Sequence, residues 1–404
     1  MREVVITGIG MRTPLGNSLD AARAVFASGR PVVRGETGPL GEVRALGRLA
    51  DDPFADFPRV DRMMVDPASL LTMRCSDDAM ADSGLDLAMA DRNRIGVFVG
   101  SGQGASTATI EGTIGYKEKN QFRPFTILRG LANGLANHVS MRHQLYGESL
   151  VIMLACAASN AAIGAAYRQI RDGYMDAALA GGVEAPHHEV AIRAWEAMRV
   201  LAKVDPEHPE RSSRPFAGDR TGLVLGEGCV LYMLEEASQA RARGARIYAR
   251  IAGFGVSSDG AHIAHPEAEG QAKALTACLR EAGAGPADIG YINAHGTATP
   301  TGDPAEVESI GKVLGSYAQQ VPVSSTKSLH GHLLGAAGAI ELLAPIVALR
   351  DGVIAPTANL DVPDPAFHLD FVPNVPRTGQ NVQAAISSNF AFGGSNACLL
   401  LTRA

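Results

Sequence analysis

The sequence predicts an α/β protein made of two similar halves. Short apolar runs of strand length alternate with stretches whose apolar residues recur at helical spacing. An apolar, strand-like segment begins the chain at residues 4–9, and a similar segment occurs at 247–255, after a charged, helix-like run over 235–246. We therefore divide the chain into residues 1–245 and 246–404, and we expect the two halves to share one core.

Each strand is predicted from an apolar, partly β-branched run that glycine or polar residues bound. In the first half these runs are residues 4–9, 95–99, 149–155 and 177–180, and in the second half 247–255, 291–294, 321–324 and 384–388. Helices are predicted over 157–170, 235–246 and 336–349, the last with a kink at Pro345.

Composition excludes several classes of protein. The formal net charge of −6 offers no general attraction to nucleic acid or to an anionic membrane surface. Charge or glycine interrupts every apolar stretch before about 18 residues, so no transmembrane span is expected. The N-terminus lacks an export-signal profile, and five cysteines without a pairing pattern fit a reducing compartment. We expect a cytoplasmic protein.

Two glycine-rich segments resemble nucleotide loops only superficially. The first, residues 8–16, follows a strand, but its third glycine is displaced and Pro14 stands where a helix should have begun. The second, residues 100–104, has no following Lys-Ser/Thr pair. Both are interpreted as tight turns.

Cys156 is the candidate nucleophile. It falls where the apolar run 149–155 ends and the helix 157–170 begins, so unpaired N–H groups of the first helical turn should point toward it. The helix dipole favours negative charge there and is expected to lower the thiol pKa below its ordinary value. Cys75, Cys229, Cys278 and Cys398 are interpreted as core residues, and no pair has the spacing of metal ligands, so we expect no metal.

Two later segments supply basic groups. His295 lies on a loop at the end of the strand 291–294, and Lys327, His330 and His332 lie in a stretch rich in glycine and small residues. His330 and His332 are two residues apart and cannot both face a site from a helix. We expect His332 to be the buried histidine that reaches Cys156.

In the segments that contain Cys156, His295 and Lys327 to His332, the chain resembles the β-ketoacyl-[acyl carrier protein] synthases, the condensing enzymes of fatty acid and polyketide synthesis. The resemblance runs nearly end to end, and further segments that carry it are 4–11, 180–185, 226–228 and 389–396. It implies a thiolase-like αβαβα layered sandwich of two duplicated halves. It also implies a decarboxylative Claisen condensation between a cysteine-bound acyl group and malonyl-[acyl carrier protein].

The resemblance assigns a role to each matching residue. Cys156 corresponds to the nucleophile, and His295 and His332 to the pair that stabilises the thioester oxygen and the enolate. Lys327 corresponds to the lysine that orients this pair, and Glu306 to the carboxylate partner of that lysine. The N–H of Phe392, the gatekeeping residue, is expected to join that of Cys156 in an oxyanion hole. The remaining matches are Thr297 and Thr299, which hold the phosphopantetheine arm.

The resemblance also indicates candidate substrate-binding residues. By alignment Gln103, Ala191 and Trp195 fall where the acyl tunnel can be lined, and we hypothesise that the indole and the amide favour short, unsaturated or polyene chains. The alternative is that Trp195 packs in the core and Gln103 faces a turn. The lysine cluster often found near residues 61–66 is missing, so Arg199 is the candidate for carrier docking.

Three functional interpretations follow. The first is a ketosynthase that needs no bound cofactor and receives phosphopantetheine on its partner, the acyl carrier protein. The second is the same chemistry in a specialised type II polyketide or aryl-polyene pathway, with a chain-length-factor partner. The third is a non-catalytic or partner-dependent subunit of such a heterodimer.

A dimer of identical or different subunits is expected, with contact through the strand before the nucleophile, residues 151–153. A degradative thiolase is disfavoured because Phe392 stands where that family has a second cysteine.

Overall fold

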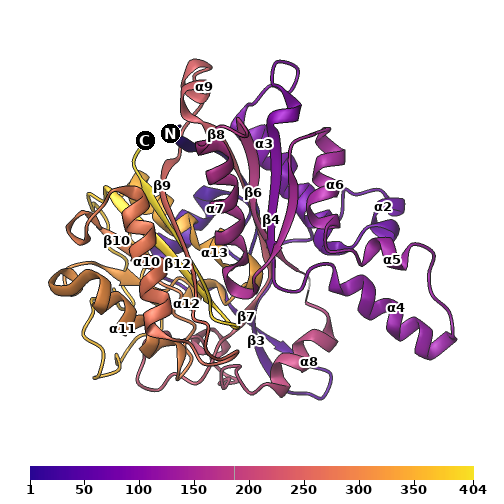
Figure 1. The fold of residues 1–404 in the computed structure, drawn as a ribbon. Coiled ribbons are helices and arrows are strands. Elements are labelled where there is room, and N and C mark those ends of the chain that lie inside the picture. Colours follow the sequence, from indigo (N-terminus) through magenta and orange to yellow (C-terminus); the bar gives the residue numbers. More distant parts are fainter. Residues whose placement is uncertain (186) are drawn as a thin grey trace.

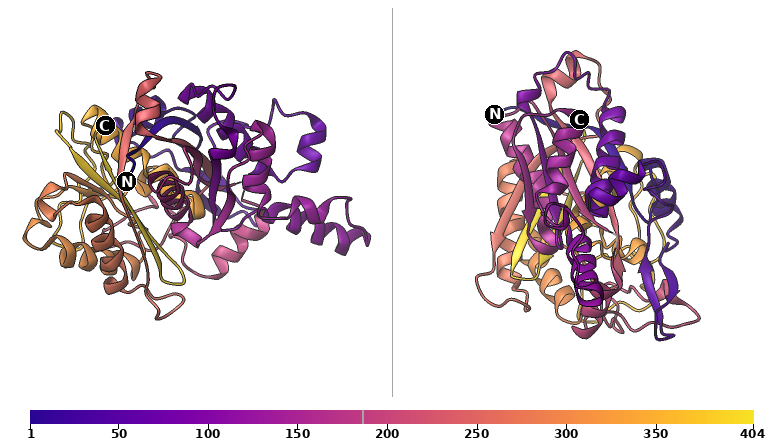
Figure 2. Two further views of the ribbon diagram at one scale, coloured as in Figure 1. Left: turned by 45° about the horizontal axis from the view of Figure 1, so that its top comes forward. Right: turned by 90° about the vertical axis from the view of Figure 1, so that its right-hand side faces the viewer.

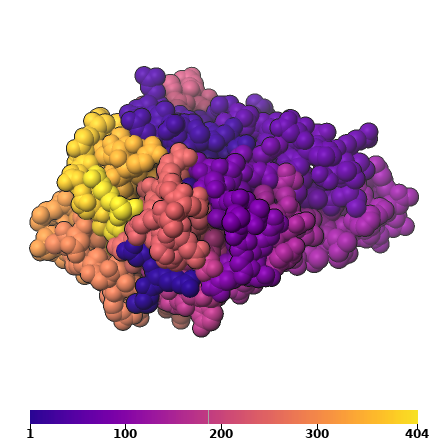
Figure 3. Space-filling view, turned by 90° about the horizontal axis from the view of Figure 1, so that it is seen from above, coloured from indigo at the N-terminus to yellow at the C-terminus, as the bar shows by residue number. Residues whose placement is uncertain are grey.

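The computed structural model describes residues 1–185 and 187–404, and its central feature is one ten-stranded sheet. The strand order is β11-β10-β12-β13-β9-β1-β8-β6-β4-β5, and the two halves lie side by side (Figures 1 and 3). The strands of the first half are β1 (Val4–Arg12), β4 (Ile95–Ser101), β5 (Ser149–Met153), β6 (Ala177–Glu184) and β8 (Gly228–Glu236). Those of the second half are β9 (Ala249–Ser258), β10 (Tyr291–Asn293), β11 (Val323–Ser324), β12 (Ala384–Ala391) and β13 (Ser395–Thr402).

The two halves repeat one topology. Numbered within each half, the strands run in the order 3-2-4-5-1 from the outer edge inward, and both halves end on β1 and β9, which pair antiparallel. In each half the fifth strand pairs antiparallel with both of its neighbours, and the other pairs are parallel. This repetition is the duplication that the sequence predicts.

Helices lie on both faces of the strands. α7 (Ala158–Arg171) and α13 (Ala337–Glu341) pack against each other between the two halves of the sheet (Figure 1). α14 (Leu343–Asp351) continues this central layer. The outer face of the first half is covered by α3 (Pro67–Ser83) and α6 (Gly134–His143), and that of the second by α10 (Ala268–Ala282) and α11 (Gly302–Leu314). The result is a layered α-β-α-β-α arrangement.

Smaller elements complete the fold. β2 (Arg34–Thr37), β3 (Val43–Gly47) and β7 (Leu225–Gly226) form a three-stranded sheet. α4 (Ser106–Lys119) projects from the first half of the molecule (Figure 2, left). The remaining helices are α1 (Leu19–Ser28), α2 (Arg59–Met64), α5 (Thr126–Arg129), α8 (Glu189–Ala197), α9 (Ala237–Ala242) and α12 (Lys327–His330). No helix in the described part of the chain is both long and apolar enough to cross a membrane.

The tight turn predicted over residues 8–16 is present only at Thr13–Gly16, where the Gly16 N–H donates to the Thr13 carbonyl at 3.0 Å, and the prediction is wrong for Gly8 and Gly10. Both lie within β1, where α3 packs directly on the strand. A Cβ atom on Gly8 would lie 2.2 Å from the carbonyl oxygen of Ala79, and one on Gly10 would lie 1.9 Å from that of Cys75. These glycines therefore allow close approach of helix and strand.

Two predicted helices differ from the structure. The run 235–246 is helical only over α9, because Glu235 and Glu236 still belong to β8 and Glu236 caps the helix by accepting from the N–H of Ser238. The run 336–349 breaks at Leu342, between α13 and α14. Pro345 has no N–H for the carbonyl of Glu341, and that carbonyl instead accepts from Asn293 Nδ2 at 3.1 Å.

Candidate active site

Cys156 lies at the predicted junction of strand and helix. β5 ends at Met153, a 3-10 helical turn covers Ala155–Ala157, and α7 begins at Ala158. Ala155 has a φ of 44°, a left-handed conformation that costs an alanine roughly 1–2 kcal/mol. This sharp turn presents the buried thiol of Cys156 at the N-terminus of α7.

The thiol is less acidic than the sequence predicts. Burial raises the pKa of Cys156 to about 12, and the nearby Lys327 ammonium lowers it only in part. The prediction of a thiolate-biased cysteine is therefore wrong, because desolvation of the charged form outweighs the opposing effect of the ammonium. Cys156 is a thiol near neutral pH in this structure.

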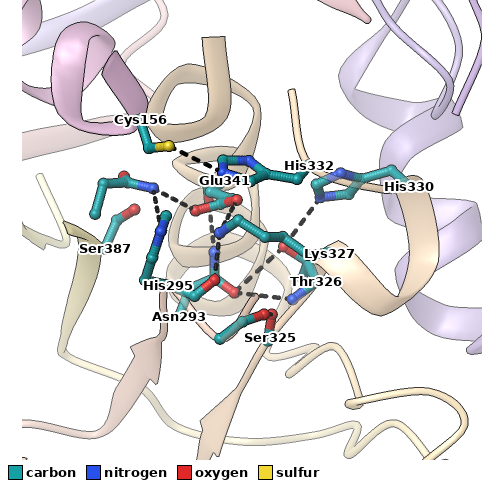
Figure 4. A network of polar contacts seen from close by, with 12 residues as sticks. Cys156, Asn293, His295, Ser325, Thr326, Lys327, His330, His332, Glu341 and Ser387 are labelled. Atoms are coloured by element: carbon teal, nitrogen blue, oxygen red, sulfur yellow. Dashed lines mark hydrogen bonds and ion pairs between the residues drawn. The ribbon is translucent and has the colours of Figure 1, made fainter. Parts of the chain in front are cut away.

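His332 faces Cys156 with a defined tautomer. Its Nε2 atom lies 3.1 Å from Cys156 Sγ (Figure 4). Its Nδ1 atom accepts a hydrogen bond from the N–H of Leu334 at 3.2 Å. Because Nδ1 accepts, the proton of the neutral ring lies on Nε2. Burial and the Lys327 ammonium hold the pKa of His332 well below its ordinary value. The ring therefore offers an N–H donor to the space beside the sulfur.

His295 has a matching arrangement. Its Nδ1 atom accepts from Asn389 Nδ2 at 3.3 Å, so the proton of the neutral ring is again on Nε2. Asn389 is oriented by donating to Glu341 Oε2 at 2.8 Å. The rings of His295 and His332 lie 5.3 Å apart between centroids, nearly perpendicular. Burial, Lys327 and His332 lower the pKa of His295 well below its usual value, so both rings are neutral donors.

Lys327 pairs with Glu341, not with Glu306 as the resemblance implies. The Lys327 ammonium contacts both Glu341 Oε1 and the backbone carbonyl of His295, and both charged side chains are buried, at 1% and 0% exposure. Glu306 instead accepts from the N–H groups of His295 at 2.7 Å and Gly296 at 2.6 Å, while burial raises its pKa to about 8. Glu306 thus holds the loop that carries His295.

His330 is as buried as His332 but faces away from Cys156. Its Nε2 atom lies 3.2 Å from Thr326 Oγ1 (Figure 4). Its Nδ1 atom lies 2.7 Å from the carbonyl oxygen of Gly331. The expectation that only His332 is buried is wrong. The expectation that only His332 of the two reaches the sulfur agrees with the geometry, because α12 ends at His330 and Gly331 turns the chain with a φ of 80°.

A cavity of about 340 Å³ opens above the thiol. Its wall includes Arg199, Thr297, Thr299 and Phe392, which were predicted to bind substrate or to gate the site. The structure does not bring Gln103, Ala191 or Trp195 to this wall among the described residues. The Gln103 N–H donates to Glu184, Ala191 lies on α8, and the Trp195 ring stacks on Phe392 with centroids 6.3 Å apart.

Three polar residues of the site were missed from the sequence. Glu341 and Asn389 have the contacts described above, and Glu184 accepts from the N–H groups of Gly102 at 2.6 Å and Gly335 at 2.9 Å. Burial raises the pKa of Glu184 to about 7. One signal was available, because Glu341 is a lone carboxylate within the apolar run 336–349 and a buried charge requires a partner.

Cys156, His295 and His332 offer three ligand atoms that all lie within 4.8 Å of one another. Sulfur and imidazole nitrogen are ligands that Zn²⁺ accepts. The adjacent Lys327 ammonium lowers the pKa of both histidines by repelling a second positive charge, and it opposes a dication in the same way. These three groups are therefore better suited to chemistry at a carbonyl than to binding a metal ion.

Comparisons with known proteins agree with the site. The chain matches "Beta-ketoacyl synthase, N-terminal domain" over residues 1–240 and "Beta-ketoacyl synthase, C-terminal domain" over 248–361. It is 40% identical to "Nodulation protein E" of Rhizobium sp. (strain N33), covering 98% of each chain. It is 39% identical to "3-oxoacyl-[acyl-carrier-protein] synthase 2" of Rhizobium meliloti (strain 1021), covering 100% of this chain and 99% of that one. A structure titled "The ishigamide ketosynthase/chain length factor" superposes with a TM-score of 0.91 at 29% identity, covering 100% and 99%.

The fold and the Cys-His-His site define a thiolase-like condensing enzyme, and the chain belongs to the β-ketoacyl synthase family. The predictions of this family, of the thiolase-like fold and of a condensing acyltransferase are confirmed. The exact domain boundary at residue 245 and the roles of the individual site residues stay predictions.

Proposed function

We propose that the enzyme joins an acyl group carried on Cys156 to the carbanion formed when a malonyl thioester loses carbon dioxide. The observation that carries this proposal is the 3.1 Å contact between Cys156 Sγ and His332 Nε2, an N–H donor, with His295 presenting a second ring beside it. A nucleophile with two donors aimed at one space suits reactions in which negative charge develops on a carbonyl oxygen.

The first half-reaction loads Cys156. The sulfur attacks the thioester carbonyl, the bond between that carbon and the carrier sulfur breaks, and the proton of the Cys156 thiol ends on the departing carrier thiol. The tetrahedral oxyanion between these states needs donors, and the N–H groups of Cys156 and Phe392 are the predicted pair. Each such donor contributes roughly 3 kcal/mol in other enzymes. The acyl-enzyme divides one difficult reaction into two easier ones.

The second half-reaction forms the carbon–carbon bond. The extender loses carbon dioxide, and the electron pair of the broken bond passes into an enolate whose oxygen accepts from the Nε2–H groups of His295 and His332. The enolate carbon attacks the acyl carbonyl, the bond to Cys156 breaks, and the sulfur takes up one proton. Neutral imidazoles suit this step because they donate without protonating the carbanion.

The proposed partner is an acyl carrier protein that delivers both thioesters on a phosphopantetheine arm. The name of the 3-oxoacyl relative includes an acyl carrier protein. Thr297 and Thr299 supply hydroxyls to the cavity wall, with their Oγ1 atoms 3.0 Å apart. Arg199 is exposed at the wall, and an arginine there suits the anionic phosphodiester of the arm. No resident cofactor is required by this chemistry, and a cytoplasmic location stays a prediction.

A second ketosynthase-like chain, identical or of the chain-length-factor type, is the proposed subunit partner. β5 is an edge strand of the ten-stranded sheet, and Leu150 and Met153 on it are 41% and 46% exposed. An unpaired apolar edge is a template for pairing with another strand. The solved ishigamide protein is named as a ketosynthase/chain length factor. Native mass measurement of the purified chain alone distinguishes a homodimer from a protomer that awaits a different partner.

The substrate preference is proposed to depend on Trp195 through the gate residue. Trp195 is stacked on Phe392 and packs beside the buried cluster of Leu46, Ile192, Leu223, Leu225 and Leu334. The hypothesis that Gln103 and Ala191 line an acyl pocket also stays a proposal. An indole against the gate favours short, unsaturated or polyene chains, which is the specialised-pathway interpretation. The non-catalytic alternative is disfavoured because the thiol and both imidazoles are assembled.

Intact mass spectrometry tests the two half-reactions directly. Incubation with an acyl carrier thioester is expected to add one acyl mass to the enzyme, and malonyl carrier is then expected to remove it and release the β-ketoacyl product. Cys156→Ala should show no adduct, whereas Cys278→Ala, at a buried cysteine outside the cavity wall, should behave as the parent. Formation of the β-ketoacyl product by Cys156→Ala would refute the proposal.

A further inference from the structure

Glu184, the last residue of β6, is a buried carboxylate that the proposed chemistry does not use. It is 3% exposed, and it is not among the described residues that line the cavity. Its partners in the described part of the chain are three backbone N–H groups and, at 3.5 Å, the hydroxyl of Ser101, with no basic side chain among them. Burying a carboxylate without a cationic partner is costly unless hydrogen bonds compensate, so the groups that Glu184 holds indicate its role.

The three N–H groups belong to two separate segments. Oε2 of the carboxylate accepts from Gly102 at 2.6 Å and from Gly335 at 2.9 Å, and Oε1 accepts from Gln103 at 3.0 Å. Gly102 and Gln103 directly follow β4. Gly335 lies in the 3-10 turn Leu334–Ala336, which begins two residues after His332. One carboxylate therefore ties the end of β4 to the turn that follows the histidine.

The two segments meet with almost no space between their backbones. A Cβ atom on Gly335 would lie 2.0 Å from the backbone nitrogen of Gly102. A Cβ atom on Gly182, in β6, would lie 3.1 Å from the carbonyl oxygen of Gly335. Because these positions are glycines, the backbones approach closely enough for one carboxylate to reach N–H groups of both segments. The glycine-rich segment 100–104 thus supplies donors to a carboxylate of the protein itself.

The turn that Glu184 holds is strained and contacts His332. Leu334 has a φ of 47°, a left-handed conformation that is unfavourable for leucine. Its N–H donates to His332 Nδ1 at 3.2 Å, which places the proton of the neutral ring on Nε2. The next N–H along the chain, that of Gly335, donates to Glu184. A strained backbone persists only where surrounding contacts determine it, and the bond to Glu184 is such a contact on the adjacent peptide.

We propose that Glu184 is a positioning residue that keeps the Nε2–H of His332 directed at the space beside Cys156 by holding the peptide between Leu334 and Gly335. The inference rests on the proposed function, in which that N–H stabilises the enolate oxygen. Glu184 acts through the histidine, and no bond is made or broken at its carboxylate.

The test compares the parent enzyme with Glu184→Met, which keeps the side-chain length but removes both acceptor oxygens. In ¹⁵N NMR with labelled histidine, the Nδ1 signal of His332 should shift from its unprotonated position toward the protonated one, because the ring is then free to adopt either tautomer. The signals of His295, which Asn389 orients, should not move and thereby report an intact fold. Condensation should slow about 10- to 100-fold, as the loss of one buried hydrogen bond implies, while acylation of Cys156 stays within about threefold.

Glu184→Gln is the matched control. Its single amide oxygen can still accept from both Gly102 and Gly335, so the His332 signals and the rate of condensation should lie closer to those of the parent than to those of Glu184→Met. If Glu184→Met does not fold, Glu184→Asp, whose shorter side chain draws the carboxylate back from Gly335, must show the same shift of the His332 signal.

Unchanged His332 signals in the variants that lose the contact would overturn the inference. Equal losses of acylation and condensation, or a Glu184→Gln enzyme as impaired as Glu184→Met, would also overturn it, because they would identify a general structural role. These outcomes differ from failure of the proposed function. If the parent enzyme forms no β-ketoacyl product from acyl and malonyl carriers, the proposed function fails, whereas the NMR comparison still decides whether Glu184 positions His332.

Discussion

Replacing Lys327 with methionine is expected to destabilise the protein in a way that depends on pH. The change removes the ammonium but leaves the Glu341 carboxyl fully buried. Breaking a buried ion pair by removing one partner costs about 3–5 kcal/mol, because the remaining charge is uncompensated. Methionine is close to lysine in length, so loss of packing adds little.

The direction of the pH dependence follows from Glu341. Burial already raises its pKa above the ordinary carboxyl value, and Lys327 opposes that rise. Without Lys327 the folded-state pKa increases further, so the folded variant holds a proton that the unfolded chain releases. The variant therefore loses stability as pH rises from the unfolded carboxyl pKa through the raised folded value, by about 1.4 kcal/mol per unit of pKa difference.

Urea denaturation of the parent and of Lys327→Met at pH 5.5 and pH 8 measures this effect. We expect a deficit in the free energy of unfolding of about 3–5 kcal/mol at pH 8 and a clearly smaller one at pH 5.5. The double variant Lys327→Met, Glu341→Leu should recover most of the loss and remove the pH dependence. A deficit that is the same at both pH values, or a double variant that is worse than both single ones, would refute this reasoning.

The remaining predictions concern single side chains around the thiol. Asn389→Leu removes the donor to His295 Nδ1, so condensation should slow about 10- to 100-fold while the mass of acylated Cys156 still appears; unchanged condensation would show that the tautomer needs no such support. Ala155→Gly should leave acylation intact and be at least as stable as the parent. Ala155→Val places a β-branched residue at a φ of 44° and should lower the free energy of unfolding, measured by urea titration, by about 1–3 kcal/mol. A valine variant as stable as the parent would contradict the strained turn. Trp195→Ala should broaden the range of acyl lengths that load Cys156, with Trp195→Phe as the control that keeps an aromatic ring against Phe392; an unchanged length preference would remove the idea of a narrowed pocket.

Much of this architecture follows from local patterns. The apolar run before Cys156 and the small residues after it determine a strand, a turn and a helix, and the repeated strand pattern predicts two halves. These features depend on residues near one another in sequence, which periodicity can detect. The positions of Gly8 and Gly10 could not be predicted in this way, because their role depends on α3 packing across β1.

Features of the site that depend on distant contacts were harder to predict. Lys327, at the start of α12, pairs with Glu341, at the end of α13, and periodicity does not show which of the two carboxylates the folded chain brings to the ammonium. The thiol pKa was misjudged because the helix terminus can be read from sequence, whereas the depth of burial that opposes it cannot.

The central claim is that both histidines are neutral and present Nε2–H donors beside Cys156. The most direct test is ¹⁵N NMR of the enzyme with labelled histidine, with signals assigned through His295→Ala and His332→Ala. The account predicts a protonated Nε2 and an unprotonated Nδ1 for both residues, without titration between pH 6 and pH 8.5. A positively charged ring at pH 7, or a proton on Nδ1 of either residue, would contradict it.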